Sequence, residues 1–282
     1  LTGQGAGTTT SNEGIYLDTG ATVASTGSGA LTLTGHAGGT TVQGVYLNQT
    51  TAANTVMSAG GTVTLRSNQT IQLSKAHIAS PTAQLFNIVI NSDLDGNSSG
   101  RIALTTSNLL SSGGNITLGG GADPLTGSAF GVAGAVEGIN LNASTLNAAG
   151  GTISLLGRGY AGTTSNYGIL MQAAAKAQTS GAGTVTMNGT GGNGTTGNRG
   201  IYLTGTGTTA STVNGALTLT VTGAVTVSGY GIDISSSASV ASTGAAALTL
   251  TGIGGTGAVG IYNSTTAATI GGASHTGNIT LT

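Results

Sequence analysis

The chain has no cysteine, no tryptophan and only two prolines, and charged residues make up 5% of its 282 residues. Without cysteine there is no disulfide framework, no thiolate zinc site and no thiol nucleophile. The net charge of −1 provides no attraction to nucleic acid or to an anionic membrane surface. No run of about 18 apolar residues occurs, so we expect no membrane-spanning helix. These absences argue against nucleic-acid binding, thiol chemistry and membrane insertion.

Glycine and threonine dominate instead, with 53 glycines arranged around two recurring short motifs. One motif, of the type Leu-Thr-Leu, begins at Leu31, Val63, Ile116, Ile153, Val185, Leu217, Leu248 and Ile279. The other, of the type Gly-Ile-Tyr-Leu, has its first aliphatic residue at Ile15, Val45, Ile139, Ile169, Ile201, Ile232 and Ile261. The last five positions of the first motif are 32, 32, 31 and 31 residues apart. Two interleaved motifs with one period predict a tandem array of a single structural unit.

Each motif alternates apolar and polar residues, which is typical of a half-buried strand rather than a helix. In residues 217–220, Leu217 and Leu219 lie on one face, and the two threonines lie on the other. One coil cannot bury enough apolar surface to offset its ordering entropy, so neighbouring coils must stack on one another. We therefore predict an all-β fold, a parallel β-helix (β-solenoid) of about eight to ten coils at the usual strand spacing.

One coil of about 31 residues per period is favoured over two smaller coils, because a closed three-sided turn needs that much chain. We expect a third, weaker strand around residues 21–23 and 240–242. The prediction for 1–282 is one continuous β-solenoid: regular coils over 1–65, irregular coils with insertions over 66–137, and regular coils over 138–282. Short strands are expected at 71–73, 86–90 and 102–104. Since both ends lie within a rung, we expect a segment of a longer protein or a subunit that stacks end to end.

The irregular block carries a recognisable phrase. Residues 91–96 read Asn-Ser-Asp-Leu-Asp-Gly, Gly100-Arg101-Ile102 follows, and residues 113–118 read Gly-Gly-Asn-Ile-Thr-Leu. The phrase resembles the filamentous-haemagglutinin-like exoproteins of bacterial two-partner secretion, and the surrounding rungs resemble autotransporter passengers. This resemblance implies a right-handed β-helix shaft, secreted through an outer-membrane partner. It also implies an extracellular location, on a Gram-negative cell surface.

Asp93, Asp95 and Asn97 alternate like the first ligands of a calcium loop. An EF-hand loop would need glycine at the sixth position and glutamate at the twelfth, where this chain has Ser98 and Leu104. The alternative is an Asx turn, in which the carboxylates bind backbone amides. Calcium is the one cofactor that the sequence suggests.

Two surface ladders are predicted. Tyr16, Tyr46, Tyr202 and Tyr262 occupy one outward position in their coils, suited either to stacking on a glycan or neighbouring fibre or to packing between rungs. Outward threonines form the second ladder, represented by Thr32, Thr218 and Thr249. A flat threonine array could bind ice; the alternative is that threonine simply suits an exposed strand. At the second threonine position the file is interrupted by Arg66, Gly119, Leu156 and Asn188.

No catalytic constellation is apparent, because the remaining acidic residues are scattered over different coils. His36, His77 and His275 are not at metal-ligand spacing. We therefore expect a non-catalytic protein, the structural shaft of a bacterial cell-surface or secreted adhesin. The alternatives are a self-assembling filament subunit and, less favoured, an ice- or glycan-binding solenoid. Expected partners are further copies of the chain or a glycan or protein receptor.

Overall fold

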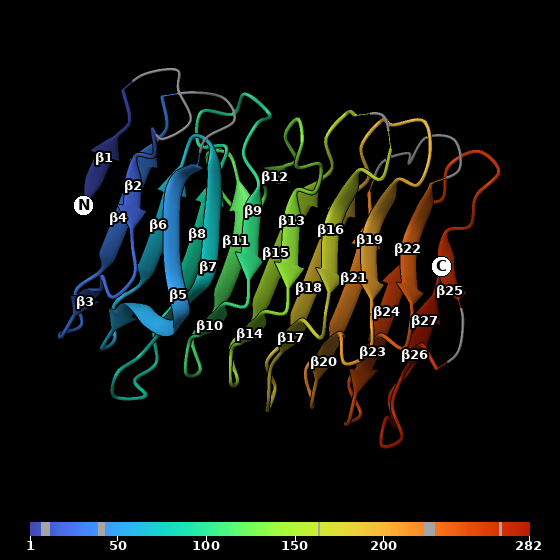
Figure 1. Ribbon diagram of the computed structural model, residues 1–282. Coiled ribbons are helices and arrows are strands. Elements are labelled where there is room, and N and C mark those ends of the chain that lie inside the picture. The colour runs from blue at the N-terminus through green and yellow to red at the C-terminus, as the bar shows by residue number, and fades with distance from the viewer. Residues whose placement is uncertain (7–11, 39–42, 163, 223–228, 265–266) are drawn as a thin grey trace.

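The computed structural model describes residues 1–6, 12–38, 43–162, 164–222, 229–264 and 267–282. Over these residues the protein contains strands and no helix. Its coils stack along one axis, from the N-terminus at the left of Figure 1 to the C-terminus at the right. All the strand pairs that make up the two sheets are parallel, as β4 with β6 and β21 with β24 illustrate. The predicted all-β parallel solenoid is therefore confirmed.

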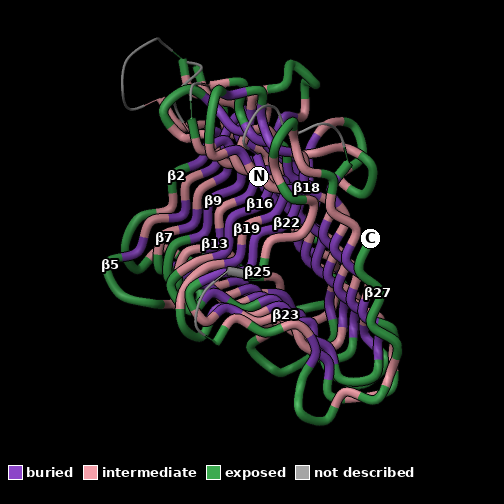
Figure 2. The backbone as a smooth tube through the Cα atoms, turned by 90° about the vertical axis from the view of Figure 1, so that its right-hand side faces the viewer, coloured by how far each residue is buried: buried purple, intermediate pink, exposed green. Residues whose placement is uncertain are grey.

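Each coil has three walls, and each wall consists of equivalent strands from successive coils. The LTL wall consists of β1 (Thr2–Gln4), β4 (Leu31–His36), β6 (Val63–Ser67), β8 (Ile88–Ser92), β11 (Ile116–Gly120), β15 (Ile153–Arg158), β18 (Val185–Thr190), β21 (Leu217–Val221), β24 (Leu248–Thr251) and β27 (Ile279–Leu281), with β12 (Ala129–Phe130) added beside β15. Figure 2 looks along the stack from the end that carries β25 and β27, and the three walls surround the buried interior.

The GIYL wall consists of β2 (Ile15–Leu17), the first parts of β5 (Gln43–Ser58) and β7 (Thr70–Ala79), β9 (Ile102–Thr105), β13 (Ile139–Asn142), β16 (Tyr167–Gln172), β19 (Arg199–Thr204), β22 (Tyr230–Ser235) and β25 (Ile261–Ser264). The third wall consists of β3 (Val23–Ser25), the last parts of β5 and β7, β10 (Asn108–Leu110), β14 (Thr145–Asn147), β17 (Lys176–Gln178), β20 (Thr209–Thr212), β23 (Ser239–Ser242) and β26 (Thr269–Ile270). Because β5 and β7 each continue around the corner, these two walls form one 16-stranded sheet.

The register places like residues on like residues. On the LTL wall Leu217 pairs with Val185 on one side and with Leu248 on the other. On the third wall, Val23 pairs with Val56, and Val240 pairs with Ala210. The predictions of one coil per period and of a third strand near 21–23 and 240–242 are thus confirmed.

The inward residues of all three walls form a single apolar core. Leu219, Ile201 and Val240, one from each wall, are completely buried in the solenoid interior. The same core cluster includes Leu33 near the first coils and Leu250 near the last. An inward side chain is therefore surrounded by its own coil and by the coils above and below.

In two successive coils, the corner between the GIYL and third walls turns through a single left-handed residue. Thr106 and Ala143 occupy this corner with φ of 51° and 50°. The next residue is a buried serine in both coils, and Ser107 N–H donates to Ser144 Oγ at 3.0 Å. Stacked hydroxyls thus satisfy the backbone groups that the turn removes from the ladder.

The irregular block keeps the same ladder. Ile88, which the Leu-Thr-Leu spacing did not include, pairs with Val63 and with Ile116. Strands occur near all three expected places, but the strand expected at 86–90 begins only at Ile88. Phe86 instead lies before the strand and is among the largest fully buried side chains. Its side chain therefore belongs to the core although it lies outside the strand.

Candidate functional site

The Asp93 segment connects β8 to β9. Asp93 is 2% exposed, and its carboxylate accepts the backbone N–H groups of Ser98 and Ser99, each at 3.2 Å. Asp95 is exposed and accepts the side-chain amide of Asn97 at 2.9 Å. Burial raises the pKa of Asp93, and the backbone N–H bonds partly oppose that rise. The carboxylate thus binds backbone amides, as that alternative expected, but the donors are five and six residues further on rather than two as in an Asx turn. Both Asp93 oxygens are engaged.

The insertion before β13 packs against this turn. Gly100, which follows the turn, exchanges backbone hydrogen bonds with Phe130 at 2.9 and 3.2 Å. Phe130 belongs to β12 and pairs on its other side with Arg158 at the end of β15. Three segments from different coils therefore meet at one corner of the solenoid.

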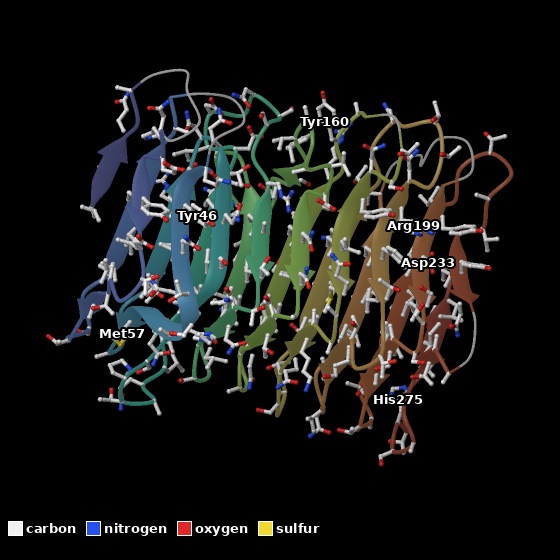
Figure 3. The ribbon with its side chains drawn as sticks, viewed as in Figure 1. Tyr46, Met57, Tyr160, Arg199, Asp233 and His275 are labelled. Atoms are coloured by element: carbon white, nitrogen blue, oxygen red, sulfur yellow. The ribbon has the colours of Figure 1, made fainter. Side chains whose placement is uncertain are left out.

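A cavity of about 210 Å³ opens where they meet, and we call it the corner pocket. It is lined mainly by Ser98, Phe130, Gly131, Arg158, Gly159 and Tyr160. Figure 3 shows Tyr160 among the loops at the upper edge of the molecule. A β-carbon on Gly131 would lie 2.2 Å from the Val136 carbonyl oxygen, so only glycine allows this close approach of the backbones.

The guanidinium of Arg158 lies beside the corner pocket. Its Cζ atom is 5.5 Å from the centre of the Phe130 ring, within cation–π distance. Arg158 is exposed, and its guanidinium makes no hydrogen bond or ion pair with any residue that the structure describes. The ring thus supports a charged group whose hydrogen-bond donors remain available.

The tyrosines of the predicted ladder contact other rings both within their row and in the neighbouring row. Tyr16 and Tyr46 pair across coils, with ring centres 5.3 Å apart. Tyr202 and Tyr262 are separated in their row by Asp233, and each contacts a ring in the neighbouring row. Tyr202 is 5.3 Å from Tyr167, and Tyr262 stacks on Tyr230 at 4.4 Å. The rings contact one another, as the packing interpretation predicts, rather than forming one file of tyrosines.

Arg199 lies at the centre of this tyrosine cluster. Its Cζ atom is 4.2 Å from the Tyr202 ring centre and 5.4 and 5.6 Å from those of Tyr167 and Tyr230. Its Nε atom donates to the Asp233 carboxylate at 2.6 Å. Figure 3 shows the two residues close together on adjacent strands. The guanidinium is therefore shared among rings and a carboxylate from three successive coils.

The ion pair holds Asp233 in an apolar setting. The Asp233 side chain is 3% exposed, and its Oδ1 atom has no hydrogen-bond partner among the described residues. Burial raises the pKa of Asp233, while the hydrogen bond and charge of Arg199 lower it. The ion pair joins adjacent coils and shields the Asp233 carboxylate from solvent, while the Arg199 side chain stays 19% exposed.

The threonine file follows the predicted register. Thr32 pairs with Thr64, and Thr218 lies between Thr186 and Thr249. At the second position, Arg66 interrupts the file beside Thr34. Leu156 and Asn188 are neighbours at the same position. Each interruption places a longer or differently shaped side chain in the surface, so a flat threonine array extends over only a few coils.

The described residues contain no group of three histidine, aspartate or glutamate side chains that could hold a metal ion. Among the histidines, His77 has the clearest role, because its Nδ1 atom accepts the Asn108 backbone N–H at 3.0 Å. Burial lowers the pKa of His77. The described residues also contain no helix long and apolar enough to cross a membrane.

No protein-family model matches the chain, and neither a curated protein nor a solved structure matches it. The resemblance to filamentous-haemagglutinin-like exoproteins therefore rests on the sequence motifs and remains a prediction.

The sequence predicted neither the corner pocket nor the Arg199 cluster, which consists of Arg199 with Asp233, Tyr167, Tyr202 and Tyr230. The sequence did contain a signal for the Arg199 cluster, because Tyr167, Arg199 and Tyr230 each directly precede a Gly-Ile dipeptide. Those positions could have been read as a second outward row. The pocket had no comparable signal, since Ser98 and Phe130 lie in the irregular block, and Arg158 lies at the end of a regular strand far from both in the sequence.

Proposed function

We propose that the protein is a structural shaft, part of a bacterial cell-surface or secreted adhesin of the two-partner-secretion type. The observation that carries the proposal is the unbroken ladder. Both sheets run through the whole stack, and the walls enclose one continuous apolar core. Parallel coils bonded on both sides resist bending and leave little extended backbone accessible to proteases.

The surface chemistry suits an extracellular shaft. Charged residues are only 5% of the chain, so hydration comes from threonine, serine, asparagine and exposed backbone. The absence of cysteine makes the fold independent of redox conditions. Each coil makes most of its contacts with the next coil, so the chain can fold by adding coils successively, as secretion in an unfolded form requires.

Negative-stain electron microscopy of the purified chain over a concentration series tests the proposal. We expect single rods about 40–50 Å long, the length of eight to ten coils at strand spacing. Long unbranched fibres that appear with concentration would favour the filament subunit instead. Compact round particles would contradict a shaft of either kind.

Surface display needs a separate test. Fusing the chain behind a two-partner secretion domain in a Gram-negative host that carries the matching outer-membrane partner should place it outside the cell. We expect protease added to intact cells to remove the fusion only after prolonged digestion, because the coils are protected. Retention of the fusion in the periplasm as a folded rod would argue against this export route.

A further inference from the structure

The corner pocket lies where the repeat is interrupted. Insertions in repeat proteins gather as loops on one face, and that face is often the binding face. Here the β8–β9 turn supplies Ser98, the insertion supplies Phe130, and the end of β15 supplies Arg158 and the adjoining Tyr160. The regular coils over 138–282 have no equivalent of β12 among their described residues. The pocket is therefore a feature added to the shaft.

The pocket contains an uncompensated positive charge. Arg101 and Arg199 form ion pairs with Glu137 and Asp233, at 3.3 and 2.6 Å. The guanidinium of Arg158 has neither an ion pair nor a hydrogen bond with any described residue, although the Phe130 ring supports it. A guanidinium presents a planar fork of donors that matches a carboxylate in two parallel hydrogen bonds.

The remaining walls suit a small ring that has both polar and apolar faces. Tyr160 is 36% exposed, so part of its ring remains uncovered, and its hydroxyl can act as donor or acceptor. Ser98 is an exposed hydroxyl whose backbone position is set by Asp93. The volume of about 210 Å³ is below the range of drug-sized ligand pockets and accommodates one sugar-sized unit.

We propose that the corner pocket binds a carboxylate-bearing sugar unit, a hexuronate. The carboxylate pairs with the Arg158 guanidinium, the apolar face of the sugar ring packs against Tyr160, and Ser98 binds a sugar hydroxyl. A singly charged carboxylate matches the single cation of the pocket. A doubly charged phosphate would retain one negative charge without a partner there. This inference is independent of the shaft proposal, because it is tested by binding rather than by particle shape.

Titration of the full chain with D-glucuronate, followed by NMR or calorimetry, tests the assignment. We expect saturable binding with a Kd on the order of 1 mM, the strength available to a ligand of this size. Arg158→Gln should weaken it about tenfold or more, the loss of one charge-assisted pair. Lys176→Gln, which removes another exposed positive charge, on the third wall, should leave the Kd unchanged. Thermal unfolding of both variants checks that they fold.

Phe130→Leu provides a second variant, because it removes the ring that supports Arg158 and retains an apolar side chain. We expect it to weaken glucuronate binding, by less than Arg158→Gln does. Glucose and inorganic phosphate complete the experiment, and both should bind more weakly than glucuronate. Equal binding of glucose would exclude the role of the carboxylate, and equal binding of phosphate would exclude the sugar. No saturable binding to the unaltered chain, or equal binding by Arg158→Gln, would overturn the proposal.

Discussion

The regular coils over 138–282 and the irregular block over 66–137 share one core and one register, but they differ in what they place on the surface. In the regular coils, repeated positions align side chains across coils, which creates the Arg199 cluster. In the irregular block, the insertion joins loops of unrelated sequence around the corner pocket. Stacking therefore constrains the inward positions strictly and leaves the corners free to vary.

The energetics explain this difference. Doubling the length of a flexible loop costs only about 0.6 kcal/mol of closure entropy, so an insertion at a corner is tolerated. A misplaced inward residue disturbs its own coil and both neighbours, and that cost is several times larger. Ile116 and Ile153 remain paired although 37 residues separate them along the chain.

The largest expected effect concerns the ion pairs of the two regions. Arg199→Gln should reduce the free energy of unfolding by about 3–5 kcal/mol, because it leaves the buried Asp233 carboxylate without its partner. Arg101→Gln in the irregular block should cost less, since the Glu137 side chain is 17% exposed and can be rehydrated. Urea unfolding of both variants measures the difference. Adding Asp233→Asn to Arg199→Gln should restore part of the loss, and equal losses at both sites would contradict the comparison.

A core truncation in each region tests whether the packing is equivalent. Leu219→Ala and Leu118→Ala should each cost about 2–5 kcal/mol, because both side chains are completely buried in the LTL wall. Thr218→Ala, one residue away and facing outward, should change stability by less than about 0.5 kcal/mol. Urea unfolding measures these changes in the free energy of unfolding from the shift in midpoint, provided that the m-value is unchanged. A loss of under about 1 kcal/mol for Leu118→Ala would show that the irregular block packs loosely.

The Asp93 turn distinguishes structural support from a calcium site. Asp93→Ala should cost about 1–3 kcal/mol, because two backbone N–H groups lose their acceptor. The exposed Asp95→Ala serves as the matched control and should have little effect. Calcium at about 1 mM, the range of extracellular calcium modules, should leave the Tm of the parent chain unchanged relative to EDTA. A calcium-dependent rise in Tm that is lost in Asp93→Ala would establish a metal site.

The smallest effect is a pH dependence from His77 in the irregular block. Burial lowers the pKa of folded His77, and its Nδ1 atom must be unprotonated to accept the Asn108 N–H. Below about pH 6.5 the unfolded chain therefore binds a proton that the folded state does not, and stability falls as the pH decreases. Thermal unfolding at several pH values should show this slope.

His77→Asn keeps an acceptor near the Nδ1 position and cannot titrate, so it should flatten that part of the pH profile. His36→Asn is the control for the loss of a histidine elsewhere on the surface. An unchanged profile in His77→Asn would assign the pH dependence to other groups.

Much of the fold could be predicted because alternation and period act locally. Val185, Leu217 and Leu248 occur at one spacing and in one apolar–polar pattern, and strand stacking makes that pattern sufficient. The prediction failed where a side chain acts outside the pattern. Phe86 lies outside the strand predicted at 86–90, although its side chain is buried in the core. Its contribution to the core does not recur with the repeat period, so the periodic pattern does not predict it.

The sequence by itself determined the strands, their order and the identity of each inward row, because a period-2 alternation repeated about every 31 residues has one way to bury its apolar face. Only the tertiary structure decided which outward residues meet. Arg199 contacts rings from three coils, and Arg158 lies beside Phe130 and lines one pocket with Ser98, because the coil spacing and the path of the insertion bring distant segments together. Such contacts depend on distances through space, which the separation of these residues along the chain does not encode.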